Sequence, residues 1–235
     1  MKVEVNKDVF SEAVSFAVKL LPQRTTLPIL SGVLISAEDN AVTISSFDYE
    51  VSAKTRVDAA VDTAGQVLVS GRLLAEIASR LPDDVVNLEL AGSSLSVKSG
   101  SAKFSLATMP IEEYPNLPEV EGIAGSIAGD EFASAVSQVA TAASRDDVTP
   151  VITGVLLDIT ASSLTMMATD RYRVAAKELA WSAAGVAEEG LQALIPARTL
   201  AEIGKTFSHA GSLTITINVG GERELVAFSS AERTV

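Results

Sequence analysis

Four segments of the chain carry apolar residues three or four positions apart, which is the spacing of a helix with one buried face. The first series is Phe10, Val14, Ala17, Val18 and Leu21, and Phe132, Val136, Val139, Ala140 and Ala143 repeat it. Two shorter series are Leu74, Ile77 and Leu81, and Leu200, Ile203 and Phe207. The pattern predicts four amphipathic helices, and the first should end at Pro22 because proline cannot continue a helix.

The two halves of the sequence resemble each other. A shift of 122 positions aligns identical residues in an ordered series, and after a small insertion near residues 181–192 the shift becomes 126. The pairs include Phe10 with Phe132, Pro28 with Pro150, Asp48 with Asp170, and Arg72 with Arg198. Such an ordered series indicates a duplicated domain.

Each half is predicted to contain a strand, a helix, several strands, a second helix and further strands. In the first half, alternating or β-branched runs predict strands at residues 33–37, 41–45, 51–57, 67–70, 85–90, 95–99 and 103–107. Two helices packed on a mainly antiparallel sheet form an α+β unit. Prolines and glycines cluster between Pro115 and Gly129, so we expect one domain at residues 1–119 and a second at 120–235.

The composition excludes several kinds of chemistry. The 235 residues include no cysteine and a single histidine, His209, which excludes disulfides, thiolate nucleophiles and multi-histidine metal sites. No glycine-rich phosphate loop occurs, and the pairs Asp83-Asp84 and Asp146-Asp147 are typical of solvated turns. We expect no catalytic residue, metal or cofactor. The first residues do not form a signal peptide and no apolar run approaches about 18 residues, so a cytoplasmic protein away from membranes is expected.

Charge is distributed unevenly over the predicted helices. The chain carries a net charge of −12, so its average surface repels phosphate. The outward helix faces, by contrast, hold four basic residues against three acidic ones; the basic ones are Lys19, Arg72, Arg198 and Lys205. Arg24 and Arg145 follow the first helix of each half. These outward helix faces are either ordinary solvated surfaces or a surface that can lie against a polyanion without binding it tightly.

A polar and aromatic cluster occurs at Ala168–Val174, where Tyr172 stands between Arg171 and Arg173. Arginine and tyrosine are common anchors of protein interfaces. An ion pair with Asp170 at the end of a strand is the alternative interpretation.

Several segments together resemble one family. They are Arg24–Leu30, Phe104–Pro110 with Tyr114–Leu117 behind it, and Ala168–Val174. With the repeat, they resemble the β subunit of bacterial DNA polymerase III, the family of replicative sliding clamps. The resemblance covers the whole chain and implies a non-enzymatic processivity factor. In the family, three such domains form a protomer, and two protomers close into a ring around duplex DNA with helices inside and sheets outside.

The resemblance implies DNA-facing roles for Arg24 and Arg72, and the repeat extends them to Arg198 and Lys205. Arg145 occupies a loop that also touches DNA in the family, although the aromatic residues common there are missing. Sparse contacts from such cations to phosphate carry no sequence information, so a ring can slide. Ser134, Ser137 and Thr141 are expected to make weak or water-mediated contacts.

The family also has a pocket between its second and third domains for short peptide motifs. These belong to the DNA polymerase III catalytic subunit, the clamp loader, repair polymerases and other partners. The matching positions here are Ile152, Thr169, Arg171, Tyr172, Arg173 and Val174. Ile152 and Val174 are expected to form apolar walls. Arg171 and Tyr172 are bulkier than the glycine and histidine common there, so the pocket shape is expected to differ.

Two other functions fit part of the pattern: a two-domain trimeric clamp of the eukaryotic and archaeal kind, and a carboxylate-dependent hydrolase using Asp146 and Asp147. On the sliding-clamp interpretation, the third domain is absent from this chain and Val235 lies inside the last strand of the second. We therefore expect a homodimeric ring for the full-length protein and a monomer for this fragment.

Overall fold

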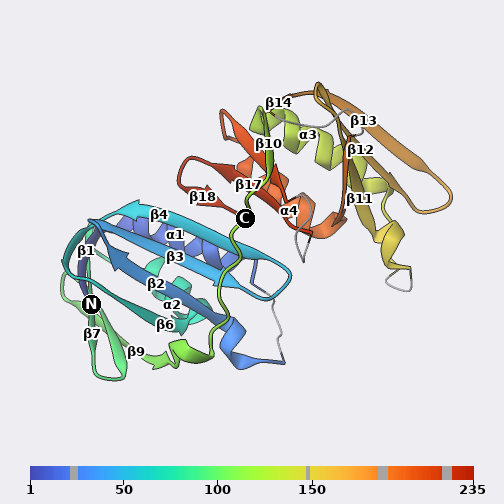
Figure 1. Ribbon diagram of the computed structural model, residues 1–235. Coiled ribbons are helices and arrows are strands. Elements are labelled where there is room, and N and C mark those ends of the chain that lie inside the picture. Colours follow the sequence, from blue (N-terminus) through green and yellow to red (C-terminus); the bar gives the residue numbers. More distant parts are fainter. Residues whose placement is uncertain (22–25, 147–148, 185–189, 219–223) are drawn as a thin grey trace. The chain divides into compact units, whose positions relative to one another are not determined.

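The computed structural model describes residues 1–21, 26–146, 149–184, 190–218 and 224–235 (Figure 1). They form two compact units: unit 1 is Met1–Pro118 together with Glu232–Val235, and unit 2 is Glu119–Ala231. Each unit combines a helix pair with antiparallel strands, so the predicted α+β class is confirmed. Among the candidate residues, Arg24 lies outside the described part of the chain, as does Asp147.

Unit 1 contains one continuous antiparallel sheet. Its helices are α1 (Lys7–Lys19) and α2 (Gly71–Ala78), and its 3₁₀ turns are η1 (Pro28–Ser31) and η2 (Ile111–Glu113). Its strands are β1 (Lys2–Asn6), β2 (Gly32–Glu38), β3 (Ala41–Phe47), β4 (Ser52–Asp58), β5 (Ala60–Thr63), β6 (Gly65–Ser70), β7 (Val85–Ala91), β8 (Ser94–Ser99), β9 (Ala102–Met109) and β18 (Arg233–Thr234). The strand order is β18-β4-β3-β2-β6-β9-β8-β7-β1-β5. The short strand β5, whose residues are mostly exposed, is one that the hydrophobic pattern did not predict.

Helix α1 begins at a capping residue and buries the predicted stripe. The Oδ1 atom of Asn6 accepts hydrogen bonds from the backbone N–H groups of Asp8 and Val9 at 3.0 and 3.2 Å, which satisfies donors that the first helical turn leaves unpaired. Phe10 and Val14 are fully buried in the core of unit 1. The helix ends at Lys19, slightly before the predicted stop.

A second, smaller apolar cluster involves the segment that leaves unit 1. Tyr114 packs with Phe47 and Leu68. Its hydroxyl accepts a hydrogen bond from the backbone N–H of Phe47 at 2.8 Å and donates one to the backbone oxygen of Gly32 at 3.3 Å. Burial raises the pKa of Tyr114 to about 12. Tyr114 therefore anchors residues 109–117 to the sheet.

Unit 2 repeats the element order of unit 1. Its helices are α3 (Gly129–Val139) and α4 (Ala197–Phe207), and its 3₁₀ turns are η3 (Ala140–Ala142) and η4 (Pro150–Thr153). Its strands are β10 (Ile123–Ile127), β11 (Gly154–Ile159), β12 (Ser163–Thr169), β13 (Val174–Ala180), β14 (Ser182–Ala184), β15 (Leu191–Pro196), β16 (Leu213–Ile217) and β17 (Val226–Ser230). They pair in the orders β14-β10-β16-β17 and β13-β12-β11-β15.

Aromatic rings mark two tightly packed positions in unit 2. Phe132 and Phe228 are both buried, with ring centroids 5.5 Å apart. The ring of Trp181 covers Gly125 so closely that an added Cβ would lie 2.5 Å from Cη2 of the indole, and the indole Nε1–H donates to the backbone oxygen of Thr160 at 2.9 Å. Position 125 therefore requires glycine, because the indole ring leaves no room for a Cβ atom.

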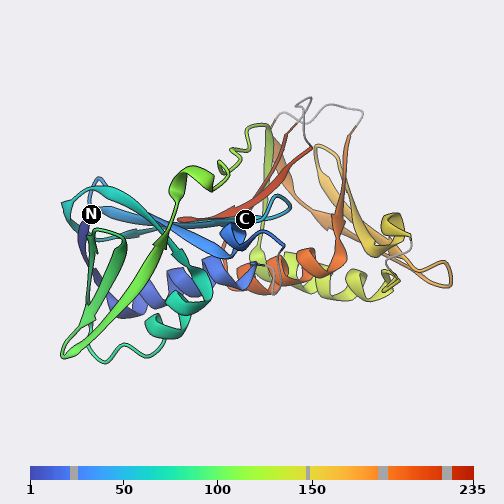
Figure 2. The same ribbon diagram turned by 90° about the horizontal axis from the view of Figure 1, so that it is seen from below.

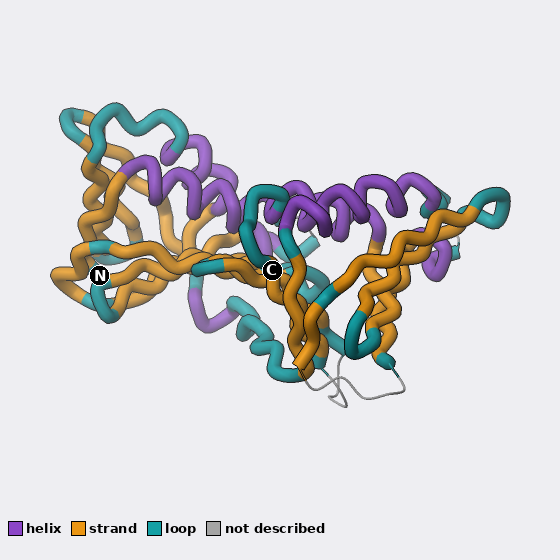
Figure 3. The backbone as a smooth tube through the Cα atoms, turned by 90° about the horizontal axis from the view of Figure 1, so that it is seen from above, coloured by secondary structure: helices purple, strands orange, loops and turns teal. Residues whose placement is uncertain are grey.

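The helix pair of each unit, taken by itself, lies on one side of its strands (Figure 2 and Figure 3). Helix α1 packs against α2, and α3 against α4. Because both helices of a pair bury their apolar stripes toward the strands, their polar faces point away from the sheet. No helix in the described ranges is long and apolar enough to cross a membrane.

Candidate nucleic-acid interface and partner surface

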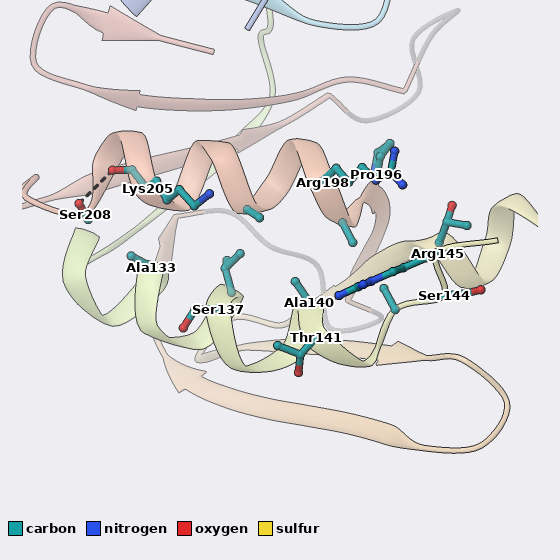
Figure 4. Close-up of a pocket in the computed structure, with 15 residues that line it drawn as sticks. Ala133, Ser137, Ala140, Thr141, Ser144, Arg145, Pro196, Arg198, Lys205 and Ser208 are labelled. Carbon is teal, nitrogen blue, oxygen red and sulfur yellow. Dashed lines mark hydrogen bonds between the residues drawn. The ribbon is translucent and has the colours of Figure 1, made fainter. Parts of the chain in front are cut away.

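Helices α3 and α4 enclose a groove of about 830 Å³ in unit 2 (Figure 4). Much of its lining consists of small side chains: the hydroxyl residues Ser137, Thr141, Ser144, Thr153 and Ser208, and the alanines that we call the floor, Ala133, Ala140, Ala143, Ala197 and Ala201. Three cationic side chains also line it, from Arg145, Arg198 and Lys205, and no carboxylate does so among the described residues. The structure therefore brings three of the five predicted DNA-facing residues to one site.

The three cations reach the groove from different elements. Arg145 follows η3, and its side chain extends toward Ala140 in Figure 4. Arg198 lies in the first turn of α4 and Lys205 in its last turn. The Nζ atom of Lys205 contacts Oε1 of Glu202 at 2.7 Å, with both side chains partly exposed, so this ion pair contributes little to stability. No carboxylate in the described ranges forms an ion pair with Arg145 or Arg198.

Two small hydroxyl residues, Ser137 in α3 and Thr141 in η3, already donate hydrogen bonds to the backbone of the preceding turn. Ser137 Oγ donates to the backbone oxygen of Ser134 at 2.8 Å, and Thr141 Oγ1 donates to that of Gln138 at 2.8 Å. A phosphate oxygen can only accept hydrogen bonds, and each hydroxyl has one proton to give. Direct contacts from these groups to DNA would therefore require the local bonds to break.

In unit 1, Arg72 lies in the first turn of α2 and is exposed. It occupies the position that the repeat pairs with Arg198. The other outward residues of that helix, Glu76 and Ser79, are exposed as well. The unit thus presents a nearly neutral polar helix face, as the sequence pattern indicated.

All the predicted partner residues except Ile152 lie at the tight turn between β12 and β13. The Oδ1 atom of Asp170 accepts from the backbone N–H groups of Tyr172 and Arg173 at 3.1 and 3.0 Å. Thr169 Oγ1 donates to the backbone oxygen of Arg173 at 2.9 Å. These bonds hold Arg171 at φ +79°, a left-handed conformation that costs a non-glycine residue about 1–3 kcal/mol when the surroundings impose it.

Two arginines tie this turn to neighbouring segments. Arg171 Nη2 donates to Thr149 Oγ1 at 2.8 Å, and Arg173 Nη2 donates to the backbone oxygen of Thr141 at 2.6 Å. Arg173 Nε also donates to Asp170 Oδ2 at 2.9 Å. Sequence reasoning missed Thr149 and the anchoring role of Thr141, since no local pattern marks a contact between distant segments.

The charge state of Asp170 follows from these contacts. Desolvation raises the pKa of its carboxyl, but the N–H donors of Arg173 and Tyr172 and the Arg173 guanidinium outweigh this, so the pKa lies below its usual value. The carboxylate form is the one that accepts all of these bonds. The ion pair with Arg173, at 2.9 Å, is therefore part of the turn itself.

Apolar side chains are unusually exposed around this turn. Tyr172 is 96% exposed and Val174 is 75% exposed. Val151 in η4, which the sequence did not single out, is 69% exposed, whereas the predicted Ile152 is half-buried. Turn η4 packs against β12, so these residues share one end of the sheet. Exposed apolar groups beside arginines are typical of a protein-binding surface.

Two α+β units in tandem, each with a pair of helices on antiparallel strands, define the class of DNA clamp folds. The family model described as "DNA polymerase III beta subunit, N-terminal domain" matches residues 1–118, and the one described as "DNA polymerase III beta subunit, central domain" matches residues 126–235. The chain therefore belongs to the DNA polymerase III beta subunit family.

Individual relatives agree with this assignment. A protein described as "Beta sliding clamp" from Micrococcus luteus is 47% identical over 233 residues, which are 99% of this chain and 74% of the relative. A protein with the same description from Streptomyces coelicolor is 43% identical over 234 residues, which are 99% of this chain and 62% of the relative. The crystal structure of the DNA polymerase sliding clamp from Bacillus subtilis superposes with a TM-score of 0.90 at 26% identity, over 100% of this chain and 63% of that one. Each relative extends beyond the matched region.

Proposed function

We propose that this chain forms two domains of a replicative sliding clamp, a non-catalytic processivity factor in the cytoplasm. The complete homodimeric ring would encircle duplex DNA, slide without sequence specificity and tether the replicative polymerase. The observation that carries the proposal is the group of cations Arg145, Arg198 and Lys205 on one helical groove of a chain whose net charge is −12. Family membership supports it.

The chemistry of these cations suits sliding. Lysine and arginine side chains contact phosphates alike at every base pair, so their contacts position a protein on DNA without reading sequence. A few exposed cations exchange between phosphates and counterions, so binding weakens as salt rises. Arg72 on α2 is assigned the same role in unit 1, and Arg24 is proposed from the family resemblance.

Residues Thr169–Val174 and Ile152 are proposed as one wall of a pocket for partner peptides. Its partners would include the DNA polymerase III catalytic subunit, the clamp loader and repair polymerases. The exposed side chains of Tyr172 and Val174 would contact apolar residues of a peptide. Because Arg173 already donates to Asp170 and Thr141, only its other N–H groups can donate a hydrogen bond to a peptide carbonyl.

The alternatives are less well supported. Both family models that match belong to the bacterial beta subunit, which favours that family over a two-domain trimeric clamp. A carboxylate-dependent hydrolase would need converging acidic groups, and among the described residues no group of three or more His, Cys, Asp or Glu side chains could hold a metal ion.

Binding of this chain to two labelled duplexes of unrelated sequence tests the proposal. We expect weak binding of equal affinity to both duplexes, with a linear fall in log affinity against log salt concentration and no cleavage in Mg²⁺ or Mn²⁺. A strong preference for one duplex, or turnover that Asp146→Ala abolishes, would overturn it. For the peptide surface, Val174→Asp should abolish binding of a short peptide containing Gln and Leu or Phe, while Val85→Asp, at an exposed valine of β7, serves as the matched control.

A further inference from the structure

The floor of the α3–α4 groove has properties that contact with DNA does not explain. Its cations Arg145, Arg198 and Lys205 suit phosphate, but the alanines between them are apolar. The outer surface of a duplex presents charged phosphates joined by sugars, and no extended apolar group projects from it to cover such a floor. A groove of about 830 Å³ is, however, within the range of sites that hold small molecules.

Comparison with unit 1 shows why the groove is open. The repeat pairs Val18 and Leu21 of unit 1 with Ala140 and Ala143 of unit 2. Val18 and Leu21 pack against the core of unit 1, and Leu21 Cδ1 lies 3.0 Å from where a Cβ on Gly71 would stand. At the position of Gly71, unit 2 has Ala197. Unit 1 therefore fills this space with a leucine over a glycine, whereas in unit 2 two alanines, each only 8% exposed, line the groove at these positions.

The charges beside the floor define what could occupy it. No carboxylate lines the groove within the described ranges, and three cations do. Arginine binds carboxylate, sulfonate or phosphate groups through paired N–H donors. An apolar body gains free energy by covering the alanines, and its charged group stays near the solvent-exposed cations.

We propose that the α3–α4 groove is a binding site for a small amphipathic anion, with its aromatic or acyl body on the alanine floor and one acidic group at the cations Arg145, Arg198 and Lys205. The ligand would compete with DNA for these cations. The site does not depend on the proposed function, because ligand binding can be measured without DNA.

Fluorescence titration of the 235-residue chain with 8-anilinonaphthalene-1-sulfonate tests the site. Arg198→Ala should weaken binding about tenfold, the loss expected for a charge-assisted hydrogen bond. Its matched control is Arg72→Ala, at the equivalent position of unit 1, which should leave the affinity unchanged. The uncharged analogue N-phenyl-1-naphthylamine should bind more weakly than the sulfonate and should not respond to Arg198→Ala.

A second variant tests the floor. Ala143→Leu with Ala197→Gly transfers the filling pair of unit 1 and should abolish binding of the sulfonate, with circular dichroism checking that the variant is folded. If that variant is unfolded, Arg198→Ala and Arg72→Ala decide the question. Failure of the parent chain to bind the sulfonate would overturn the proposal, as would equal affinity in the parent chain and Arg198→Ala. A parent chain that binds the sulfonate but binds no DNA duplex would contradict only the proposed function.

Discussion

The guanidinium of Arg173 donates a hydrogen bond from Nη2 to the backbone oxygen of Thr141 at 2.6 Å. Arg173 belongs to the exposed turn after β12, whereas Thr141 lines the groove between α3 and α4. One side chain thus connects the candidate partner surface of unit 2 to its candidate DNA surface. This contact also holds the end of the α3 segment against the β12–β13 hairpin.

Removing the α4 cations should weaken DNA binding in a salt-dependent way. We expect Arg198→Ala combined with Lys205→Ala to reduce the slope of log affinity against log salt by about 2, since each phosphate contact contributes about 0.9. Fluorescence anisotropy with a labelled duplex measures this slope. The control is Lys98→Ala with Lys103→Ala, an exposed pair opposite each other on β8 and β9. Equal slopes in both double variants would contradict the assignment.

The hydrogen bonds of Asp170 predict a pH-dependent contribution to stability. Because its pKa in the folded state lies below the usual value, the contribution is present above the unfolded pKa of about 3.9 and is lost as pH falls through the lower folded pKa. Asp170→Asn should therefore be less stable than the parent chain at pH 7, with the difference shrinking below about pH 4. Urea unfolding at a series of pH values measures it, and a difference that stays constant with pH would contradict the prediction.

Tyr114 should stabilise unit 1 through its buried hydroxyl. Tyr114→Phe leaves the N–H of Phe47 and the backbone oxygen of Gly32 without this partner, which should cost about 1–3 kcal/mol in the free energy of unfolding. Tyr172→Phe is the matched control, because Tyr172 is 96% exposed and its loss should be within about 0.5 kcal/mol. Urea denaturation compares the two; equal effects would show that Tyr114 is no anchor.

Gly125 should not tolerate a side chain. An added Cβ would meet the ring of Trp181 at 2.5 Å, so Gly125→Ala should destabilise unit 2 by about 1–3 kcal/mol and displace the indole. Because the chain contains a single tryptophan, its fluorescence reports that displacement directly. Gly211→Ala, where no atom lies within 4 Å of the added Cβ, should leave both the spectrum and the unfolding midpoint nearly unchanged.

Local pattern was enough to predict the repeated unit and most of its elements. Phe10 and Phe132, which the shift of 122 positions aligned, are both fully buried on the first helix of their units. Helical periodicity is a property of neighbouring residues, so it is visible without the fold. The hydrophobic pattern did not predict strand β5 because the strand is short and mostly exposed. Its partner, β1, is also distant in the sequence.

By itself, the sequence determined the duplicated α+β organisation and the residue types at the candidate surfaces. The tertiary structure decided which of them meet. The groove exists where the small side chains of Ala140, Ala143 and Ala197, which come from different segments, meet. The left-handed conformation of Arg171 depends on its hydrogen bonds to Thr149 and Thr169. The groove and the bond from Arg171 to Thr149 bring together residues far apart in the chain, and their geometry is set by packing, which no local periodicity records.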